Sequence, residues 1–590
     1  MNFFAPFTLP FIIGASLMFI IIAVKYLIWL LKLSRADKKL ILKGVFSFKS
    51  LTAAWEVVRE SLLHMKIFRT NPLLGYMHMS LAFGWFLLIA TGWLETISVL
   101  GWVFVPLQGH VFFKYFASTM ALGENHTFTF FMDLFLAVVL SGVALALTKR
   151  FYSQLMGMRK STNHILGDRI ALSALWFIFP ARLVAESLTC SIYGGGSFLT
   201  GTLGGWLSGV ATPQIMDGAW WFYSICLGVF FVALPFSRYM HIFTEIPLIF
   251  LRHYGLKPTA KSGSYDNFEL EACSRCGICI DPCQLQNILE INDVQSVYFM
   301  RDRRYNMLEL SKANNCLMCG RCQAACPVGI NLDTLRLNSR DAMRNEPNEK
   351  RFEYFDSLDR SVGQGKVGYF AGCMTMLTPS TMSSMEKIFE AVGDDVWWAD
   401  RNGGVCCGRP LHLAGEVDSA RKMMDYNRDL FTKHKITTLV TSCPICLRVF
   451  KEEYDLKGVE VIHHTEYIDR VTREGRLNVT SMGESYTYHD PCELGRGCGV
   501  YDAPRRVIES VGILRESLHN RENALCCGSS LANTVITDSQ QVKIATMLTD
   551  ELTASGAKTI VTSCPLCKKA LVRTTETPVK DISEIVASHI

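Results

Sequence analysis

The sequence predicts an α-helical bundle of five transmembrane helices, followed by a helical cysteine-rich module and two duplicated α/β lobes. Three observations support this fold class: five long apolar runs in the first half, two four-cysteine runs near the middle, and a five-cysteine pattern that occurs twice afterwards. The chain of 590 residues has room for several domains. We expect the membrane domain to span 1–252, the cysteine-rich module 265–360, and the two lobes 361–480 and 481–590.

The apolar runs predict the membrane domain. Apolar residues make up 49% of the chain, and the long runs all lie before residue 260. A helix needs about 20 apolar residues to cross a bilayer. Runs of this kind occur at about 11–31, 76–99, 127–148, 170–190 and 219–236. The alternative, buried helices of a globular protein, would require an exceptionally large core to cover five such runs in succession.

Basic residues predict the orientation of these helices. They cluster in three loops and are almost absent from the segments 100–126 and 192–218. The clustered residues are Arg35, Lys38, Lys39, Lys43, Lys49, Lys149, Arg150, Arg159, Lys160, Arg169, Arg238, Arg252 and Lys257. Since cytoplasmic loops carry the excess of Lys and Arg, we expect a multi-pass protein of the cytoplasmic (inner) membrane, with its N-terminus outside and its cysteine-rich half in the cytoplasm. These loops explain the net charge of +5, which gives no indication of nucleic-acid binding.

The two four-cysteine runs predict iron–sulfur clusters. Cytosolic thiols stay reduced, so 21 cysteines in this location do not indicate a disulfide framework. Both runs have the C-x2-C-x2-C-x3-C spacing of ferredoxins with two [4Fe-4S] clusters, in which the fourth cysteine binds the neighbouring cluster. We assign Cys273, Cys276, Cys279 and Cys326 to the first cluster, and Cys316, Cys319, Cys322 and Cys283 to the second. A zinc site, the alternative, prefers four ligands in CxxC pairs.

A five-cysteine pattern with a central Cys-Cys pair and a final CxxC predicts two homologous lobes. Its members are Cys373, Cys406, Cys407, Cys443 and Cys446 in the first copy, and Cys492, Cys526, Cys527, Cys564 and Cys567 in the second. Val-Thr-Ser-Cys-Pro at each CxxC predicts a strand that runs into a helix with Pro in its first turn, where the helix dipole favours a thiolate. Adjacent cysteines suit two irons of a cluster better than the single tetrahedral ion of a structural zinc site, which is the alternative.

Together these motifs resemble a known family. Paired five-cysteine lobes, called CCG domains, after two ferredoxin motifs resemble the catalytic subunit of membrane-bound heterodisulfide reductase. The five-helix half resembles its b-type cytochrome partner and the gamma-type cytochromes of nitrate reductase. The fusion is also similar to bacterial membrane oxidoreductases that link electron-transfer flavoprotein to menaquinone. The resemblance implies a noncubane [4Fe-4S] cluster in each lobe, at which a disulfide is cleaved one electron at a time.

Histidines near the ends of two apolar runs predict a haem b site. His78 lies near the cytoplasmic end of the second run and His241 follows the fifth, so we expect this pair to ligate one haem. Histidines satisfied by hydrogen bonds are the alternative. The resemblance to gamma-type cytochromes implies a second haem through a histidine about 18 residues before His241, but Tyr223 occupies that position. The remaining candidates for a second haem are His64, His110 and His126.

Charged residues inside apolar runs are costly and therefore suggest a function. Arg182 and Glu186 lie one helical turn apart in the fourth run, and Asp133 lies in the third. Either these residues line a quinone pocket or a proton path, or Arg182 and Glu186 form a mutual ion pair. We expect the quinone, a substrate, to bind near the haem.

The motifs together predict an electron-transfer chain. The sequence lacks a Walker A motif, a Rossmann glycine fingerprint and a hydrolase nucleophile elbow. We expect a quinone-linked oxidoreductase that moves electrons between membrane quinone or phenazine and a cytoplasmic disulfide or dithiol, through haem b, two cubane and two noncubane clusters. In the alternative, electron-transfer flavoprotein is the partner, menaquinone is reduced, and the CCG clusters act as relays. Further membrane subunits fit either hypothesis.

Overall fold

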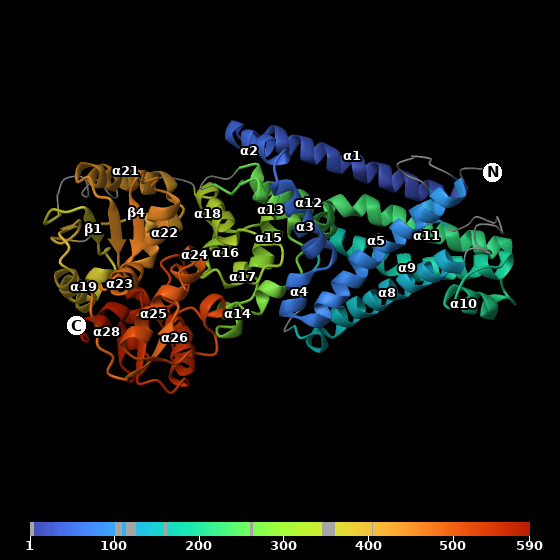
Figure 1. Ribbon diagram of the computed structural model, residues 1–590. Coiled ribbons are helices and arrows are strands. Elements are labelled where there is room, and N and C mark those ends of the chain that lie inside the picture. The colour runs from blue at the N-terminus through green and yellow to red at the C-terminus, as the bar shows by residue number, and fades with distance from the viewer. Residues whose placement is uncertain are drawn as a thin grey trace. The chain divides into compact units, whose positions relative to one another are not determined.

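The structure is a computed structural model, and it describes residues 5–100, 109–113, 126–158, 162–259, 263–344, 360–403 and 405–590. The chain divides into two compact units, whose elements are labelled in Figure 1. The first unit comprises Met1–Pro258 and Gly263–Ile278, and Cys279–Ile590 forms nearly all of the second. The apolar helices lie in the first unit and the duplicated lobes in the second.

The first unit is a helical bundle. The described residues contain five helices that are long and apolar enough to cross a membrane. These helices are α1 (Leu9–Leu31), α5 (Pro72–Leu100), α8 (His126–Phe151), α9 (Leu166–Tyr193) and α11 (Pro213–Ala233). Helix α11 packs against α1 and α9, and α5 packs against α8. The five predicted membrane helices are confirmed.

Local sequence explains where α11 begins and α9 ends. Pro213 occupies the first turn of α11, and the Thr212 hydroxyl accepts a hydrogen bond from the Ile215 amide at 3.3 Å. Both features suit a helix start, where amides lack partners inside the helix. Helix α9 ends before Gly194, which has a φ of 76°, a conformation that glycine adopts without strain.

Helices α1 and α11 cross at two glycines. A Cβ atom on Gly228 would lie 2.6 Å from the Pro10 carbonyl oxygen, and one on Gly14 would lie 2.6 Å from the Gly228 carbonyl oxygen. Small residues of this kind let membrane helices approach closely. We therefore expect Gly228→Ala to destabilise the bundle by about 1–3 kcal/mol, because the added methyl group forces two backbones apart.

Thermal unfolding of the purified protein in detergent measures this effect. The matched control is Gly218→Ala on the same helix, where a Cβ atom would meet no other atom within 4 Å. We expect Gly218→Ala to keep or slightly raise the Tm, since glycine weakens a helix interior. Equal Tm values for the two variants would contradict a tight crossing at Gly228.

Shorter helices connect and follow the membrane helices. They are α2 (Arg35–Val45), α3 (Lys49–Glu56), η2 (Val57–Leu62), α4 (Met65–Thr70), α6 (Gly109–Phe112), α10 (Thr200–Leu207), α12 (His241–His253) and α13 (Tyr265–Ala272). Helix α12 packs against α3 and α13. His64 lies between η2 and α4 with a φ of 52°, so the backbone turns sharply at this histidine.

The second unit begins with a mostly helical segment, residues 279–344, which we call the ferredoxin module. Its helices are α14 (Gln284–Asn287), α15 (Ser296–Arg304), α16 (Leu310–Asn314), α17 (Arg321–Ala324) and α18 (Leu332–Ala342). Among the predicted cluster cysteines of this module, Cys322 lies in α17, and the others lie outside these five helices.

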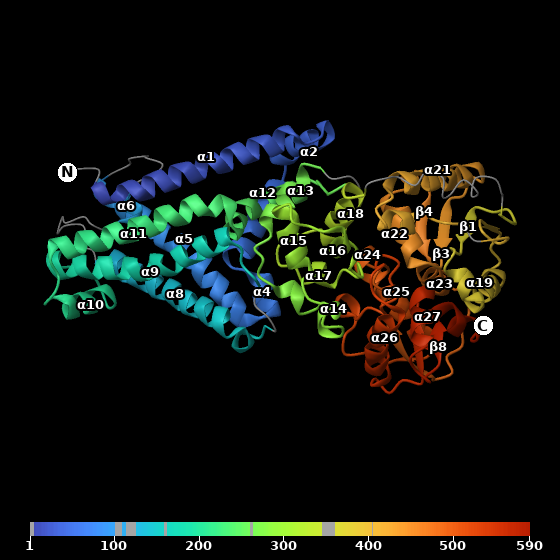
Figure 2. The same ribbon diagram turned by 180° about the vertical axis from the view of Figure 1, so that it is seen from behind.

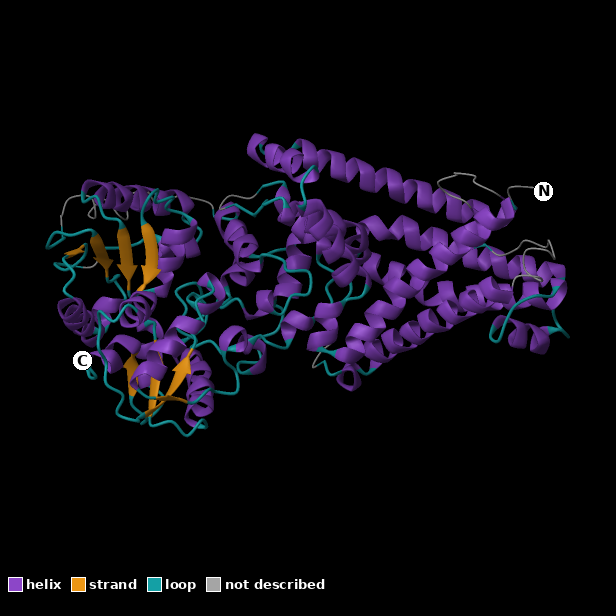
Figure 3. Ribbon diagram, in the orientation of Figure 1, coloured by secondary structure: helices purple, strands orange, loops and turns teal. Residues whose placement is uncertain are grey.

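The first lobe (360–480) and the second lobe (481–590) each contain a parallel sheet, drawn in orange in Figure 3. The first sheet has the order β2 (Val396–Trp398), β1 (Val367–Phe370), β3 (Thr438–Thr441), β4 (Glu460–His463), and the second has β6 (Ile513–Leu514), β5 (Ser485–His489), β7 (Thr559–Thr562), β8 (Val579–Asp581). The same strand order in both lobes confirms the predicted duplication of an α/β unit.

Helices surround both sheets, as the view from behind in Figure 2 also shows. They are α19 (Pro379–Val392), α20 (Arg409–Leu413), α21 (Val417–Lys433), α22 (Pro444–Glu452) and α23 (His464–Arg473) in the first lobe, and α24 (Gly495–Cys498), α25 (Asp502–Val511), α26 (Asp538–Thr553), α27 (Pro565–Val572) and α28 (Ile582–Ala587) in the second. One buried apolar cluster contains Tyr369 and Val440 of the first lobe and Tyr488 and Val561 of the second. The lobes therefore pack on a common core.

Candidate iron–sulfur and haem sites

In the first lobe, the segments that follow β1, β2 and β3 carry the predicted cluster cysteines. Gly372 follows β1 with a φ of 88°, and its amide donates to an Asp400 carboxylate oxygen at 2.7 Å. A Cβ atom on Gly372 would lie only 3.1 Å from Cys446 Sγ, so glycine leaves room for the thiol. Cys443 is the N-cap residue of α22 and Cys446 lies in its first turn, as the repeated Ser-Cys-Pro sequence predicts.

The five predicted cysteines of the first lobe lie together. Cys446 is hydrogen-bonded to Cys407 and Cys443. Cys373 is hydrogen-bonded to Cys406, and this bond lowers the pKa of Cys406 to about 7. The Cys373 side chain also interacts electrostatically with Cys443 and Cys407, which joins the five thiols into one group.

The second lobe repeats this arrangement. Cys564 is the N-cap residue of α27 and is hydrogen-bonded to Cys567. The Cys567 sulfur lies 3.3 Å from the Cys527 sulfur. Cys526 is hydrogen-bonded to Cys492 and Cys527. The structure therefore brings together the five predicted cysteines of this lobe as well.

These two thiol groups fit iron–sulfur clusters. The cysteines of both CxxC motifs are buried, and the first cysteine of each pattern is half-buried. Cysteine thiolates are the usual ligands of iron–sulfur clusters. Because several thiols share one small buried space, a polynuclear cluster satisfies them where a single tetrahedral ion would not. The assignment of a noncubane cluster to each group remains a prediction.

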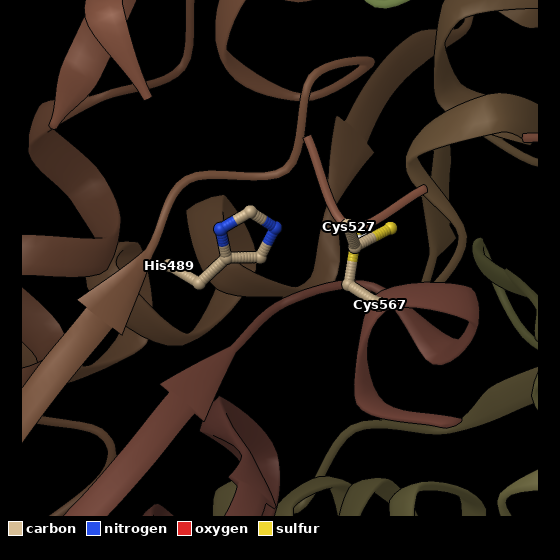
Figure 4. Close-up of side chains that lie close together, drawn as sticks. All are labelled: His489, Cys527 and Cys567. Carbon is tan, nitrogen blue, oxygen red and sulfur yellow. Dashed lines mark hydrogen bonds between the residues drawn. The ribbon is translucent and has the colours of Figure 1, made fainter. Parts of the chain in front are cut away.

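A histidine joins the thiols of the second lobe. Figure 4 shows His489 beside Cys527 and Cys567, and one potential ligand atom from each of the three lies within 4.8 Å of the other two. Hydrogen bonds from Cys526 and Cys567, with a further one from His489, hold the pKa of Cys527 well below its usual value. The cysteine motifs gave no indication of this histidine.

The first lobe has Phe370 where the second has His489, since each residue ends the first strand of its lobe three residues before a cluster cysteine. Aligning the two repeats on their first cysteine would have singled out His489 in the sequence. We expect His489→Phe to lower the reduction potential of the second-lobe cluster, because it removes a hydrogen bond to a ligand sulfur. Redox titration followed by EPR measures the shift. The matched change, Phe370→His, should raise the first-lobe potential, whereas unchanged potentials in both variants would contradict this role.

Four ferredoxin-type cysteines also lie together, in the second unit. Burial raises the pKa of Cys283 to about 12, and the neighbouring thiols of Cys316 and Cys319 add to this effect. Cys322 lies close to the same two thiols. These are the residues predicted to hold the second cubane cluster. In the other predicted set, Cys273 and Cys276 belong to the first unit and Cys279 and Cys326 to the second, so this set stays a prediction.

Four histidines, His64, His78, His164 and His241, line one cavity in the first unit. The buried Nε2 atom of His78 has no hydrogen-bond partner among the described residues. The rings of His64 and His78 stack with 5.5 Å between their centroids. His241 Nδ1 lies 2.7 Å from the Arg238 carbonyl oxygen, a contact that typically orients a metal-binding imidazole. Arg150 and Arg238 line the same cavity, so its residues fit a haem with anionic propionates.

The structure thus brings the predicted pair His78 and His241 into one cavity and adds His64 and His164, the second of which the sequence analysis did not single out. Burial lowers the pKa of His64, which favours the neutral imidazole that binds metals. The sequence indicated His64 as a candidate ligand of a second haem, but the residue lies beside His78. The side chains of the other two candidates, His110 and His126, lie outside the described residues.

The charged residues inside the bundle have partners. Arg182 Nε lies 2.9 Å from Glu186 Oε1, and both side chains are buried, so the ion-pair alternative describes these two residues. The Asp133 carboxylate accepts hydrogen bonds from the amides of Leu199 and Thr200 at 2.8 and 2.9 Å. Asp133 therefore anchors the start of α10.

Aromatic packing surrounds Tyr223, the residue at the position of the second haem ligand in gamma-type cytochromes. Its side chain is 1% exposed. Its ring centroid lies 5.4 Å from that of Phe113 and 5.7 Å from that of Trp220. These side chains fill the space around Tyr223, which favours a single haem at the other cavity.

Comparisons with known proteins identify two types of domain in this chain. A family model described as a cysteine-rich domain, CCG, matches residues 367–451 and 486–572. A model described as a 4Fe-4S dicluster domain matches residues 269–330. A Methanosarcina acetivorans protein, named as a subunit of dihydromethanophenazine:CoB–CoM heterodisulfide reductase, is 22% identical over 370 residues, which cover 52% of this chain and 88% of that protein. The chain is a heterodisulfide reductase homologue.

Two other relatives extend the comparison. The EtfAB:quinone oxidoreductase of Syntrophomonas wolfei subsp. wolfei is 23% identical over 479 residues, which cover 62% of this chain and 67% of that protein. A subunit of the fumarate reductase (CoM/CoB) of Methanothermobacter marburgensis is 26% identical over 344 residues, covering 51% of this chain and 68% of that protein. The predicted resemblance to heterodisulfide reductase and to flavoprotein-linked quinone oxidoreductases is confirmed, and this heterodisulfide reductase homologue is a membrane-associated iron–sulfur oxidoreductase.

Proposed function

We propose that this protein transfers electrons between quinone or phenazine in the membrane and a disulfide in the cytoplasm. The observation that carries this proposal is the presence of two complete five-thiol groups on one common core. The thiol of Cys443 in the first lobe lies close enough to that of Cys564 in the second for like-charge repulsion between them to help raise the pKa of Cys564, so the two groups lie near each other. Reduction of a disulfide to two thiols takes up two electrons and two protons, and two adjacent one-electron sites suit that requirement.

The residues between the lobes supply groups that can hold and transfer protons. Noncubane clusters, when bound, would supply the electrons. His463 Nδ1 lies 3.0 Å from Thr465 Oγ1, and the Thr465 hydroxyl donates to Ser563 Oγ at 3.2 Å. All three side chains are buried, and Ser563 directly precedes Cys564. This row of hydrogen bonds ends beside the thiol group of the second lobe, where protons are needed.

The first unit supplies the membrane side of the reaction in this proposal. His78 and His241 would hold haem b, with His64 beside them, and Arg150 and Arg238 would bind its propionates. The haem, when bound, exchanges single electrons with quinone. The neutral form of each imidazole is the one that binds iron. We infer that the quinone site adjoins this cavity.

Stopped-flow reoxidation tests the proposed direction and substrate. The dithionite-reduced protein is mixed with a panel of disulfides, oxidised electron-transfer flavoprotein or a menaquinone analogue, and the haem absorbance is followed. We expect rapid oxidation by at least one disulfide. Oxidation by the quinone analogue and by no disulfide would overturn the disulfide proposal.

A second candidate function is electron transfer from electron-transfer flavoprotein to menaquinone. One specific observation favours it: a relative that matches 62% of this chain bears the name EtfAB:quinone oxidoreductase. In this case the thiol groups of both lobes would act as relays. Haem reduction by the reduced flavoprotein, together with a lack of reaction with disulfides, would support this candidate.

A further inference from the structure

The two lobes differ in how their adjacent cysteines are held. In the first lobe, Asn427 Nδ2 donates to the Cys406 carbonyl oxygen at 2.8 Å, and Tyr454 Oη donates to the Cys407 carbonyl oxygen at 3.0 Å. Both supporting side chains belong to the first lobe itself. In the second lobe, the corresponding peptide of Cys526 is held by a residue of the ferredoxin module.

That residue is Gln284. Its side-chain oxygen accepts a hydrogen bond from the Cys526 amide at 2.7 Å, and its side-chain nitrogen donates to the Cys526 carbonyl oxygen at 3.1 Å. Gln284 is 3% exposed and directly follows Cys283, a predicted ligand of the second cubane cluster. Two buried hydrogen bonds from one side chain thus fix a predicted noncubane ligand relative to a predicted cubane ligand.

The thiol groups of the module and the second lobe meet at Cys319 and Cys526. These two side chains are hydrogen-bonded. Cys319 belongs to the predicted second cubane site and Cys526 to the predicted second-lobe site. A direct contact between ligands of two clusters gives electrons a short path between them.

Further contacts stabilise the packing of the ferredoxin module against the second lobe. Arg496 Nε donates to the Cys319 carbonyl oxygen at 2.6 Å, and Ser530 Oγ donates to the Leu317 carbonyl oxygen at 2.6 Å. Leu285, Val294 and Leu317 of the module pack with Cys526, Ile536 and Ile544 of the second lobe in one buried cluster. Polar and apolar contacts together hold the module against the cysteine-bearing face of the second lobe.

The first lobe also contacts the module, through Leu413 and through Arg448, whose Nη1 atom lies 3.6 Å from Asp333 Oδ2. Arg340 Nη1 donates to the Leu413 carbonyl oxygen at 2.5 Å, six residues beyond Cys407. The thiols of the first lobe interact with the second lobe instead, through Cys443 and Cys564. The contacts between thiols therefore run in series, from the module to the second lobe and from there to the first.

We propose that the second lobe is the port through which electrons pass between the ferredoxin module and both lobes, and that Gln284 is the positioning residue of this port. Clusters held at Cys319 and at Cys526 would, when bound, exchange single electrons across this contact, with no covalent bond made or broken. The first lobe exchanges electrons with the second. This inference rests on the proposed function, because it assumes redox-active clusters in both lobes.

EPR of the purified full-length protein tests the order of the sites. Redox titration brings the cubane and lobe clusters into paramagnetic states, and spin–spin broadening of the cubane signal reports the neighbouring cluster. Cys567→Ser removes a second-lobe ligand, and Cys446→Ser is the matched change in the first lobe. We expect the broadening to be lost in Cys567→Ser and retained in Cys446→Ser. The reverse pattern, or equal broadening in both, would overturn the proposal.

Gln284→Met tests the positioning role separately. Methionine keeps most of the side-chain volume but makes neither hydrogen bond to Cys526. We expect wild-type iron content, weaker spin–spin broadening, and slower reduction of the lobe clusters than of the cubane clusters in freeze-quench samples. Asn427→Ala is the matched control, because it removes the corresponding support in the first lobe, and it should leave the broadening unchanged. Wild-type broadening in Gln284→Met would exclude the positioning role.

These measurements test the electron port independently of the proposed disulfide function. The broadening is measured without any disulfide, quinone or flavoprotein, so its pattern does not depend on the substrate. If the protein reduces no disulfide but shows the expected pattern of broadening, the port is supported and the disulfide function is excluded. If the protein reduces disulfides but shows the reverse pattern of broadening, the disulfide function is supported and the port is excluded.

Discussion

Substituting serine for Cys564 is expected to abolish disulfide reduction while the cubane clusters and the haem remain reducible. Cys564 is 5% exposed, caps the start of α27 and is hydrogen-bonded to Cys567. A serine hydroxyl stays protonated at neutral pH and is a poor replacement for a thiolate ligand. Mutation of a residue that only hydrogen-bonds to a metal ligand lowers metal affinity or activity by roughly 10–100-fold. The loss of a ligand itself should therefore lower activity by more than that.

The measurements for this variant are iron and acid-labile sulfide content, together with the rate of disulfide-dependent haem oxidation. The matched control is Cys498→Ser, which changes a half-buried thiol of the same lobe outside the five-cysteine group. We expect the control to keep the iron content and rate of the wild type. If Cys564→Ser lost its cluster iron but still reduced disulfides, the second lobe would not take part in the reaction.

The grouping of the lobe cysteines could be predicted because its determinants are local. Each Ser-Cys-Pro sequence ends a strand and starts a helix, which puts Cys443 and Cys564 at helix N-termini. The duplication then predicted the rest, since two copies whose cysteine spacings differ by only one residue are expected to fold alike. The five membrane helices were predictable for a similar reason, because a helix that crosses a bilayer satisfies its backbone internally and needs mainly length and apolar composition.

Contacts between segments far apart in the sequence could not be predicted in this way. His489 carries no motif, and its place beside Cys527 depends on how β5 pairs with β7 in the second sheet. Gln284 follows a cluster cysteine, but its partner Cys526 lies 242 residues further along the chain. The left-handed backbone conformation of His64, which precedes α4 in the cavity-lining segment, likewise has no signal in a single sequence.

For the charged residues in the fourth membrane helix, the structure decides between the two interpretations that the sequence left open. From the sequence, Arg182 and Glu186 fitted either a proton path or an ion pair, because a spacing of four residues allows both. The structure pairs them at 2.9 Å inside the bundle. A buried charge beside an oppositely charged partner destabilises the fold less than an isolated buried charge does. Their presence is therefore explained without a substrate.

Replacing His78 with leucine is expected to remove haem b and to stop quinol-dependent reduction of the iron–sulfur clusters. Its Nε2 atom is buried without a described hydrogen-bond partner, so an iron ligand would satisfy it. Reduced-minus-oxidised spectra and a pyridine haemochrome assay measure the haem. Direct reduction by dithionite should still reach the clusters, because it bypasses the membrane domain.

The matched variants His241→Leu and His64→Leu show which histidine would hold the haem together with His78. All three side chains line the same cavity, so each substitution perturbs its shape to a similar degree. If His78 and His241 are the axial pair, His241→Leu loses the haem, whereas His64→Leu keeps it with a shifted potential. Loss of haem in His64→Leu and retention in His241→Leu would instead assign the axial pair to His64 and His78. That outcome would assign the haem to the part of the cavity beside the sharp turn before α4, and the contacts of His241 there include its hydrogen bond to the Arg238 carbonyl oxygen.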